Sequence, residues 1–462
     1  MISKKLNHRL LVSCQMSLKK KGATMFTLPN YLFLPLKWVC LVLVFIIFMN
    51  LIYFTCLSFF GLKKPKRDYP IVPDQKKFVF VVPAHNEEAV IAQTIESMLQ
   101  QNYAKELFDI VTSSDHCTEP TSDIVKAYGN VGLLENQSAA DEPRGKPHAI
   151  AKYIETGHWR KYDHMAFIDA DNIVSRNFLR EMNSQLTAHP EFSVIQGYLG
   201  IKNVATSLTA SGYAAVYFIT NRAVQYANYR LGWNAAIGGT GFVLDTDYLA
   251  ERGWNPRSYT EDFELQVELS MAGRRSGWNH FAVVYDEKPN SFKASHTQRT
   301  RWAQGHWFVA FSTTLKQLGT IVKSASLTEL LSKIETLFYS YSMVRPVAFL
   351  FIGLAVCIDH RLIGYLPHLL SLLYFWLTIE CFNFLIIPCT YFFQEAKPYF
   401  KQKKTLLAKC QLLFRLVVGF IWNSVTYMLA QVVGFCTWFR PQNNWKKTVH
   451  TMNVDESLEK EW

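Results

Sequence analysis

Hydrophobic runs divide the chain into membrane-like and soluble segments. Trp38–Leu62 is a nearly unbroken apolar run, long enough to span a bilayer. It is too long for a signal-peptide core and lacks a small-residue cleavage pattern, so we interpret it as a permanent anchor. Further hydrophobic stretches lie near 338–358, 366–393 and 412–438. The residues between the anchor and these stretches have the mixed polarity of a soluble domain.

Short apolar runs in the soluble part predict strands. Phe78–Val82 is a continuous β-branched and aromatic run, typical of a buried parallel strand, and Pro83 is expected to end it. Glu87–Gln101 then has helical spacing. Two more predicted strands are Phe108–Thr112 and Met165–Ile168, each followed by a polar turn. Strand–loop–helix units in series predict an α/β fold with a doubly wound sheet, whose ligands bind at the carboxyl ends of the strands.

The same pattern predicts the organisation of the chain. Leu315–Lys333 mixes apolar and basic positions, as a helix lying in the membrane interface does. The loop Lys397–Lys409 is rich in lysine, and the positive-inside tendency places it in the cytoplasm. The expected regions are a polar basic N-terminal tail (1–30), a transmembrane anchor (31–62), a soluble α/β domain (63–312), an interfacial helix region (313–337), a C-terminal transmembrane region of about three hydrophobic segments (338–438) and a C-terminal tail (439–462).

Charge adds information about partners. The formal net charge is +11, from 48 Lys+Arg against 37 Asp+Glu. The basic residues cluster beside apolar runs, where such residues set membrane topology and contact anionic lipid headgroups. This pattern favours membrane lipid over nucleic acid as a partner. The 9 cysteines form no C-x-x-C pair and most lie in apolar runs, so we expect buried, reduced thiols.

Acidic residues follow two of the predicted strands. Asp115 follows the strand Phe108–Thr112, whereas Asp169 and Asp171 follow Met165–Ile168. Two carboxylates at i and i+2 beyond a strand end can hold a divalent cation and a ribose. Mg²⁺ and Mn²⁺ bind through one or two carboxylates together with substrate phosphates. The spacing alone fits a pair of turn aspartates equally well.

A third acidic motif opens a predicted helix that runs to Gly273. Thr260 is the expected N-cap, followed by Glu261 and Asp262. Acids in a first turn also complement the helix dipole without any catalytic role. A general base at Asp262 needs a pKa above the ordinary value of about 3.9. Glu261 and Glu264 raise that pKa and the helix N-terminus lowers it, so the sequence leaves the direction open.

Basic and aromatic residues form one further motif. Gln298 and Arg301 share a helical face, with Trp302 next to them. Arginine offers forked donors to phosphate oxygens, and an indole gives a flat surface for a sugar ring. An interfacial Arg/Trp anchor beside a membrane has the same pattern. Upstream, Gly238-Gly239-Thr240-Gly241 permits close approach of a ligand to the backbone, as would an ordinary turn.

Taken together, these motifs resemble the processive membrane branch of glycosyltransferase family 2, which holds cellulose, chitin, hyaluronan and poly-N-acetylglucosamine synthases. The matching motifs occur in the family's order over roughly residues 78–302: Pro83-Ala84-His85-Asn86-Glu87, Asp115, Asp169-Ala170-Asp171, Thr260-Glu261-Asp262 and Gln298-x-x-Arg301-Trp302. The chain departs from the family at three positions. Ser114 precedes Asp115 where many members carry a second aspartate, Glu119 stands where Asp is usual, and His85 replaces the commoner Tyr.

The resemblance implies an α/β GT-A fold flanked by transmembrane helices, and a role for each matched residue. The residues that would bind the nucleotide-sugar are Ala84, Glu87, Asp115, Lys146 and Asp169. Asp171, with Asp169, would hold Mg²⁺ or Mn²⁺, and Asp262 would be the base for the acceptor hydroxyl. By the same resemblance, Gln298, Arg301 and Trp302 would face the diphosphate and the acceptor sugar.

The implied function is inverting transfer from a UDP-sugar to a growing β-linked polysaccharide. The catalytic domain is then expected in the cytoplasm, where sugar nucleotides are found, and the N-terminus outside. Single-sugar transfer to a lipid acceptor, of the ceramide or polyprenyl type, is the alternative. A non-catalytic membrane protein with a decayed domain is disfavoured because the acids and the arginine of the motifs are all present.

Overall fold

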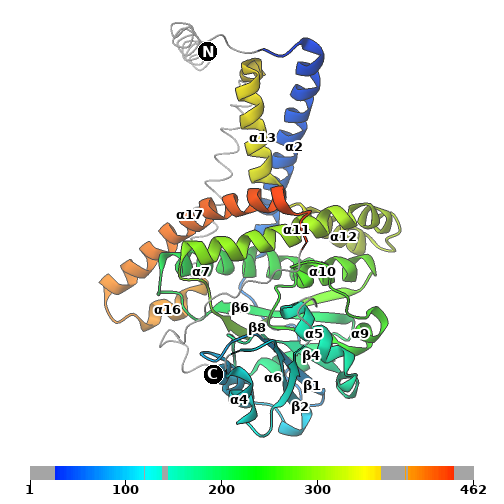
Figure 1. Ribbon diagram of the computed structural model, residues 1–462, viewed down its shortest axis with the longest axis vertical. Coiled ribbons are helices and arrows are strands. Elements are labelled where there is room, and N and C mark those ends of the chain that lie inside the picture. The colour runs from blue at the N-terminus through cyan, green and yellow to red at the C-terminus, as the bar shows by residue number, and fades with distance from the viewer. Residues whose placement is uncertain (1–26, 119, 138–143, 366–390, 392–393, 442–462) are drawn as a thin grey trace. The chain divides into compact units, whose positions relative to one another are not determined.

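A computed structural model describes residues 27–118, 120–137, 144–365, 391 and 394–441. The chain divides into two compact units, Met1–Thr55 with Met343–Ile386, and Cys56–Ser342 with Ile387–Trp462. The described part of the first unit contains most of α2 (Asn30–Phe60), α13 (Val344–Ile358) and the short helix η4 (His360–Tyr365). Here α2 and α13 lie side by side (Figure 1), with the buried Phe33 and Cys40 packed near Ala355.

The second unit is built on an eight-stranded mixed sheet with the strand order β3-β2-β1-β4-β7-β6-β8-β5. Its strands are β1 (Phe78–Ala84), β2 (Phe108–Asp115), β3 (Gly132–Asn136), β4 (His164–Phe167), β5 (Ile173–Val174), β6 (Phe192–Ile201), β7 (Phe242–Asp245) and β8 (Arg275–Asp286). Strands β3, β2, β1 and β4 run parallel to one another. Strand β7 runs antiparallel to both β4 and β6. The expected doubly wound arrangement therefore describes one half of the sheet, and the antiparallel β7 makes the whole sheet mixed.

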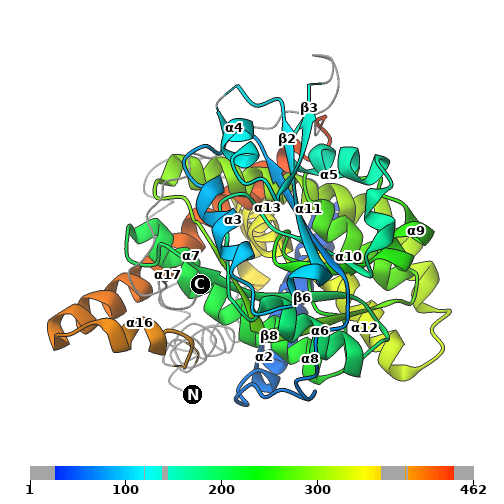
Figure 2. The same cartoon turned by 90° about the horizontal axis from the view of Figure 1, so that it is seen from below.

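Helices cover both faces of the sheet because side chains alternate along its buried strands. On β1, Phe78, Phe80 and Val82 join one core, whereas Val79 and Val81 join the other. The first core is covered by α3 (Ile91–Leu99), α4 (Thr121–Lys126) and α6 (Phe178–Ala188), and the second by α5 (Lys146–Glu155), α9 (Thr246–Arg252) and α10 (Glu261–Met271). Figure 2 shows α3 and α5 on opposite sides of β1.

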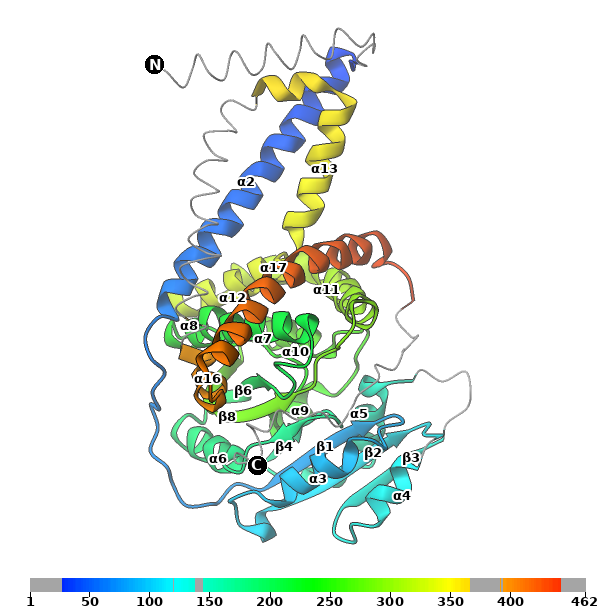
Figure 3. The ribbon, with the colours of Figure 1, turned by 90° about the vertical axis from the view of Figure 1, so that its left-hand side faces the viewer.

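A further group of helices packs together within the same unit. It consists of α7 (Leu208–Thr220), the π-helical turn η3 (Asn221–Tyr226), α8 (Ala227–Arg230), α11 (Phe292–Ile321), α12 (Leu327–Ser340), α16 (Lys397–Gln402) and α17 (Leu406–Thr437). Figure 3 shows α17 beside α7 and α11, and it contacts both. Glycines permit this close packing, since a Cβ at Gly212 would lie 2.3 Å from the carbonyl oxygen of Gly419.

Two helices among the described residues, α2 and α17, are long and apolar enough to cross a membrane. The number rises to three if α12 and α13 form one bent span. These helices correspond to the expected anchor and to the hydrophobic stretches 338–358 and 412–438. The stretch 366–393 lies outside the described residues except for Tyr391, and so do most of the two terminal tails.

Several predicted element ends are wrong. Strand β1 continues through Pro83 to Ala84, because β4 ends opposite Val81 and the last residues of β1 pair only with β2. A residue without an N–H donor is tolerated at such an edge. Helix α3 begins at Ile91 rather than Glu87, since Asn86 adopts a left-handed conformation with φ 57° and the chain turns before the helix. Helix α11 continues without a break across the expected boundary at residue 312.

Candidate active site

Asp115 ends β2 and holds the start of α5 in place. Its Oδ2 accepts a hydrogen bond from the Gly145 backbone N–H at 2.8 Å, and its Oδ1 accepts one from Asn136 Nδ2 at 2.8 Å. His116 Nδ1 lies 2.8 Å from the same Oδ1. The side chain of Asp115 is fully buried. Asp115 therefore holds the residue that directly precedes α5, whose first residue is Lys146.

Lys146 is the centre of the polar cluster. Its Nζ lies 2.6 Å from Asp169 Oδ1, 3.5 Å from Glu261 Oε1 and 2.6 Å from the carbonyl oxygen of Gly239. Burial alone would lower the pKa of Lys146, but the charges of Asp169, Glu261 and Asp262 raise it above its ordinary value. Three segments that are distant in sequence therefore meet around one cation that stays charged. They are the loop after β4, the start of α5 and the start of α10.

Asp262 lies in the first turn of α10, next to Glu261. Burial and then the negative charge of Glu261 raise the pKa of Asp262 to about 7, against the lowering effect of Lys146. This gives the direction that the sequence left open. A general base works best when its pKa lies near the working pH. Asp262 has that property, and its Oδ1 is held by the backbone N–H of Phe263 at 2.8 Å.

The expected N-cap at Thr260 is only partly correct. Helix α10 begins at Glu261 as predicted, but within the described part of the chain the Thr260 hydroxyl makes no capping bond to the helix. It lies 3.5 Å from the Ser258 hydroxyl instead. The backbone of Thr260, at φ −121° and ψ 69°, is outside the extended conformation in which a cap side chain reaches back to the first turn.

Asp169 and Asp171 follow β4 and lie near a third carboxylate, Asp286 at the end of β8. Burial, and the negative charges of Asp171 and Asp169, raise the pKa of Asp286 to about 6, against the lowering effect of Lys288. A group of like charges with oxygen donors fits a hard divalent cation such as Mg²⁺ or Mn²⁺. Among the described residues, no three His, Cys, Asp or Glu side chains form a complete metal cage. Binding by one or two carboxylates plus donor phosphates needs no such cage.

The α11 motif splits into residues with different surroundings. Burial lowers the pKa of Arg301 to about 10, opposed by the nearby Glu261 and Asp169, so Arg301 remains a cation beside the acidic cluster at neutral pH. Arg299 lies elsewhere, since its Nη1 donates to the carbonyl oxygen of Asn423 on α17 at 3.1 Å. Of these two arginines, Arg301 is therefore the one in electrostatic reach of the site.

Gln298 and Trp302 both contact α7. The Tyr213 hydroxyl donates to Gln298 Oε1 at 3.3 Å, and the Trp302 ring meets the Tyr213 ring edge-on with centroids 6.4 Å apart. Lys288 Nζ lies 5.9 Å from the centre of the Trp302 ring. Trp302 is half-buried, so part of its surface is accessible.

The end of β1 and the loop after it carry two residues expected to bind the nucleotide-sugar, Ala84 and Glu87. Ala84 is the buried last residue of β1, and the Glu87 backbone N–H donates to Thr121 Oγ1 at 2.9 Å. His85 Nδ1 lies 2.6 Å from the carbonyl oxygen of Asp115. These contacts fasten the loop after β1 to the end of β2, which is the edge where the acidic residues gather.

The ion pair between Lys288 and Asp286, at the same edge of the sheet, was not predicted from the sequence. Lys288 Nζ bonds to Asp286 Oδ2 and lies 2.9 Å from the Tyr217 hydroxyl, and both members of the pair are inside the protein rather than on its surface. The acid that follows the apolar end of β8 is the same signal that identified Asp115 and Asp169. Glu261 was expected only as a neighbour of Asp262, whereas the structure places it against Lys146.

Comparisons with known proteins agree with this arrangement. A family profile described as "Glycosyltransferase like family 2" matches residues 73–305. The chain is 24% identical over 237 residues to the probable glycosyltransferase YdaM of Bacillus subtilis (strain 168), covering 50% of this chain and 56% of that protein. It is 24% identical over 241 residues to a poly-beta-1,6-N-acetyl-D-glucosamine synthase of Staphylococcus aureus (strain COL), covering 51% and 55%. The chain thus spans about half the length of these curated relatives.

Among solved structures, the mannosyltransferase PcManGT from Pyrobaculum calidifontis, in complex with GDP-Man and Mn²⁺, has a similar fold. The TM-score is 0.52 at 16% identity, and the match covers 84% of this chain and 99% of that one. At that identity the likeness concerns the fold alone. The sheet, the edge where the acids gather and the matched profile over residues 73–305 lead to one conclusion: this chain belongs to glycosyltransferase family 2, and its α/β unit has the GT-A fold.

Proposed function

We propose that the protein is an inverting glycosyltransferase that moves a sugar from a UDP-sugar to a growing β-linked polysaccharide at the membrane. The observation that carries the proposal is Asp262, a carboxylate with its pKa raised to about 7 beside a half-buried lysine that also holds Asp169. Such a group can take a proton from an acceptor hydroxyl near neutral pH. The similarity to a poly-beta-1,6-N-acetyl-D-glucosamine synthase supports a polymer as product.

The reaction would be a single displacement. The acceptor hydroxyl oxygen attacks the anomeric carbon from the face opposite the diphosphate, and its proton moves to the carboxylate of Asp262. The bond between the anomeric carbon and the diphosphate oxygen breaks, and its electron pair leaves with UDP. One displacement inverts the anomeric centre, so an α-linked donor gives a β-linked product. Help from a positioned base is typically worth about 10²–10⁴ in rate.

The departing diphosphate needs positive charge. Lys146 is half-buried and stays protonated at neutral pH, because the neighbouring carboxylates raise its pKa. Arg301 lies within electrostatic reach of Asp169 and Glu261. A divalent cation, Mg²⁺ or Mn²⁺, would add charge neutralisation at the diphosphate and would be held by Asp169 and Asp171. Gly239 would admit the donor closely, since its φ of +80° and missing side chain leave room beside Asp262.

The acceptor side supports a polymer. Trp302 gives a flat surface beside Gln298, and stacking on an indole tolerates repeated shifts of a sugar chain because it reads no unique set of hydroxyls. We also propose that the unit containing β1–β8 and the Lys397–Lys409 segment are cytoplasmic, with the N-terminus outside. The lysine content of that segment supports this orientation.

Donor screening and product sizing test the proposal together. Membranes containing the protein are incubated with single labelled UDP-sugars, UDP release is measured, and the product is sized. We expect one UDP-sugar to give a polymer. A product that is only a lipid-extractable monosaccharide conjugate would replace the polymer by the single-transfer alternative.

Asp262→Asn is expected to abolish transfer while UDP affinity stays nearly unchanged, and near-normal turnover would reject the base assignment.

Topology has a separate test. A cysteine replaces Gln402 at the end of α16, and intact cells are treated with a membrane-impermeant thiol reagent. We expect labelling only after the membrane is opened. Strong labelling of intact cells, compared with the parent protein, would show that the orientation is reversed.

A further inference from the structure

A cavity of about 560 Å³ lies between β6, β8 and the segment around α16. Tyr285 on β8 lines this cavity. The next residue, Asp286, lies near Asp171 and Asp169, whose negative charges raise its pKa. Successive side chains of a strand point to opposite faces. The cavity and the candidate active site therefore use opposite sides of the same strand.

The cavity is basic with an aromatic lining. The cavity is lined by three basic residues and one carboxylate. The basic residues are Lys64, Arg222 and Lys397, and the carboxylate is Glu395. That carboxylate is already neutralised, because Arg222 Nη1 lies 2.5 Å from Glu395 Oε1 and the Tyr198 hydroxyl donates to Oε2 at 3.0 Å. Lys64 and Lys397 are exposed at the rim, so the surplus charge available to a ligand comes from these two lysines.

His280 adds an unused polar atom to the lining. Burial lowers the pKa of His280 to about 4 despite the nearby Glu395, so the ring is neutral at pH 7. Its Nδ1 is buried and has no hydrogen-bond partner among the residues that the structure describes. A buried polar atom of this kind costs stability unless a ligand or water satisfies it.

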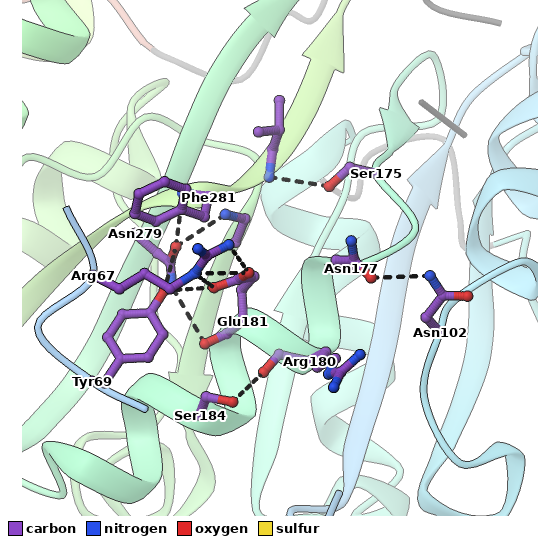
Figure 4. Close-up of polar contacts among 12 residues, drawn as sticks. Arg67, Tyr69, Asn102, Ser175, Asn177, Arg180, Glu181, Ser184, Asn279 and Phe281 are labelled. Atoms are coloured by element: carbon purple, nitrogen blue, oxygen red, sulfur yellow. Dashed lines mark hydrogen bonds and ion pairs between the residues drawn. The ribbon is translucent and has the colours of Figure 1, made fainter. Parts of the chain in front are cut away.

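The wall that carries Lys64 is fixed by an ion-pair network rather than left as a loose linker. Figure 4 shows Arg67 between Glu181 and the ring of Phe281. Arg67 Nη2 lies 2.6 Å from Glu181 Oε1, and the Arg67 guanidinium carbon lies 4.1 Å from the Phe281 ring centre. The Tyr69 hydroxyl donates to the same carboxylate at 2.7 Å. Phe281 itself lines the cavity.

Arg222 fixes the same wall from the other side. Its Nη2 donates to the carbonyl oxygens of Gly61 at 2.8 Å and Lys63 at 3.0 Å. Arg222 is fully buried and comes from the π-helical turn η3. Single π-turns inside helices are frequently found at functional sites. The wall of the cavity that carries Lys64 is thus held by contacts on both sides of that lysine.

The chain around the cavity identifies the source of the ligand. Lys64 follows the end of the apolar helix α2 by four residues, and Lys397 lies between the hydrophobic stretch 366–393 and α17. Further lysines adjoin both segments, at positions 63, 66, 401, 403 and 404. Basic groups placed directly beside apolar helices meet the phosphates of anionic lipids. We propose that this cavity binds the phosphate-bearing head group of an anionic phospholipid.

The test measures binding to the full chain in a neutral detergent, so it does not depend on transfer activity. Dihexanoyl-phosphatidylglycerol is titrated by calorimetry, with dihexanoyl-phosphatidylcholine and glycerol 3-phosphate as separate arms. We expect saturable binding of the phosphatidylglycerol alone. The double variant Lys64→Gln/Lys397→Gln should weaken it by about thirtyfold, as two surface lysine contacts would.

A matched variant separates the cavity from general charge. Lys403→Gln/Lys404→Gln removes the same charge from neighbouring positions that do not line the cavity, and we expect less than about a twofold change in affinity. Both variants change exposed or half-exposed lysines, and equal melting temperatures without lipid check that they fold. Equal losses in the two variants would overturn the site, equal binding of phosphatidylcholine would overturn the anionic head group, and equal binding of glycerol 3-phosphate would overturn the lipid.

Discussion

Replacing Glu261 by glutamine tests whether the raised pKa of Asp262 governs the reaction. The pKa of Asp262 is raised from 3.8 to about 7, with burial as the larger cause and the charge of Glu261 as the second. The substitution removes that negative charge and leaves Lys146 held by Asp169 at 2.6 Å. Both effects favour the ionised form of Asp262, so its pKa should fall.

The size of the effect follows from the order of the causes. A like charge in close contact shifts a pKa by about one to three units, and we take about one unit because burial remains. A base must be ionised, so kcat/KM is lost as the pH falls through its pKa, and a lower pKa moves that loss to lower pH. At pH 6 the ionised fraction of Asp262 would rise from about one tenth to about one half, so kcat/KM relative to its own plateau should rise about fivefold.

The assay is the pH profile of UDP release between pH 5 and pH 9 for wild type and variant, each normalised to its own plateau. Glu264→Gln is the matched control, since Glu264 lies in the same first turn but pairs with Arg257 at 2.6 Å. We expect its acidic limb to coincide with that of wild type. An unmoved limb in Glu261→Gln, or the same shift in Glu264→Gln, would refute the assignment of the limb to Asp262.

Three further substitutions test the site and its frame. Asp171→Ala should lose the Mn²⁺ dependence of UDP binding in calorimetry, and an unchanged dependence would remove Asp171 from the cation site. Gly239→Ala should lower turnover by about tenfold or more with little change in melting temperature, because it adds a Cβ at φ +80° and 3.1 Å from Asp262 Oδ2. Gly61→Ala should instead destabilise the fold by about 1–3 kcal/mol, measured by thermal unfolding in detergent, because its Cβ would lie 2.1 Å from the carbonyl oxygen of Arg222.

The part of the site that follows from strand order could be predicted from the sequence. Asp169 comes directly after an apolar run and Asp115 a few residues after one, and the carboxyl ends of parallel strands meet at one edge of a sheet. Their placement at the same edge of the sheet therefore follows from the order of apolar runs and acids along the chain. The mixed character of the sheet does not, because the direction of β7 depends on pairings with both β4 and β6 rather than on its own four residues.

Contacts between distant segments could not be predicted from the sequence. Gly212 and Gly419 are ordinary helix positions when taken alone, and only their packing shows that neither tolerates a Cβ. The same holds for Lys146, whose partners Gly239 and Glu261 are far from it along the chain. Spacing can indicate which residues carry chemistry, but it does not identify their partners or how strongly burial changes their charge.

The charges of the candidate site lead to a condition on donor binding. Five carboxylates gather around three cations: the acids are Asp169, Asp171, Glu261, Asp262 and Asp286, and the cations are Lys146, Lys288 and Arg301. Lys288 is committed to Asp286 and Tyr217, and Lys146 is held by Asp169, Glu261 and the carbonyl oxygen of Gly239. A diphosphate brings further negative charge to a site that already has an excess, and burial makes that repulsion stronger than in water. Donor binding should therefore be coupled to the binding of a cation that enters with the diphosphate. Of the two carboxylates that contact Lys146, Asp169 is the more accessible. Its exposed edge is therefore where that cation would bind first.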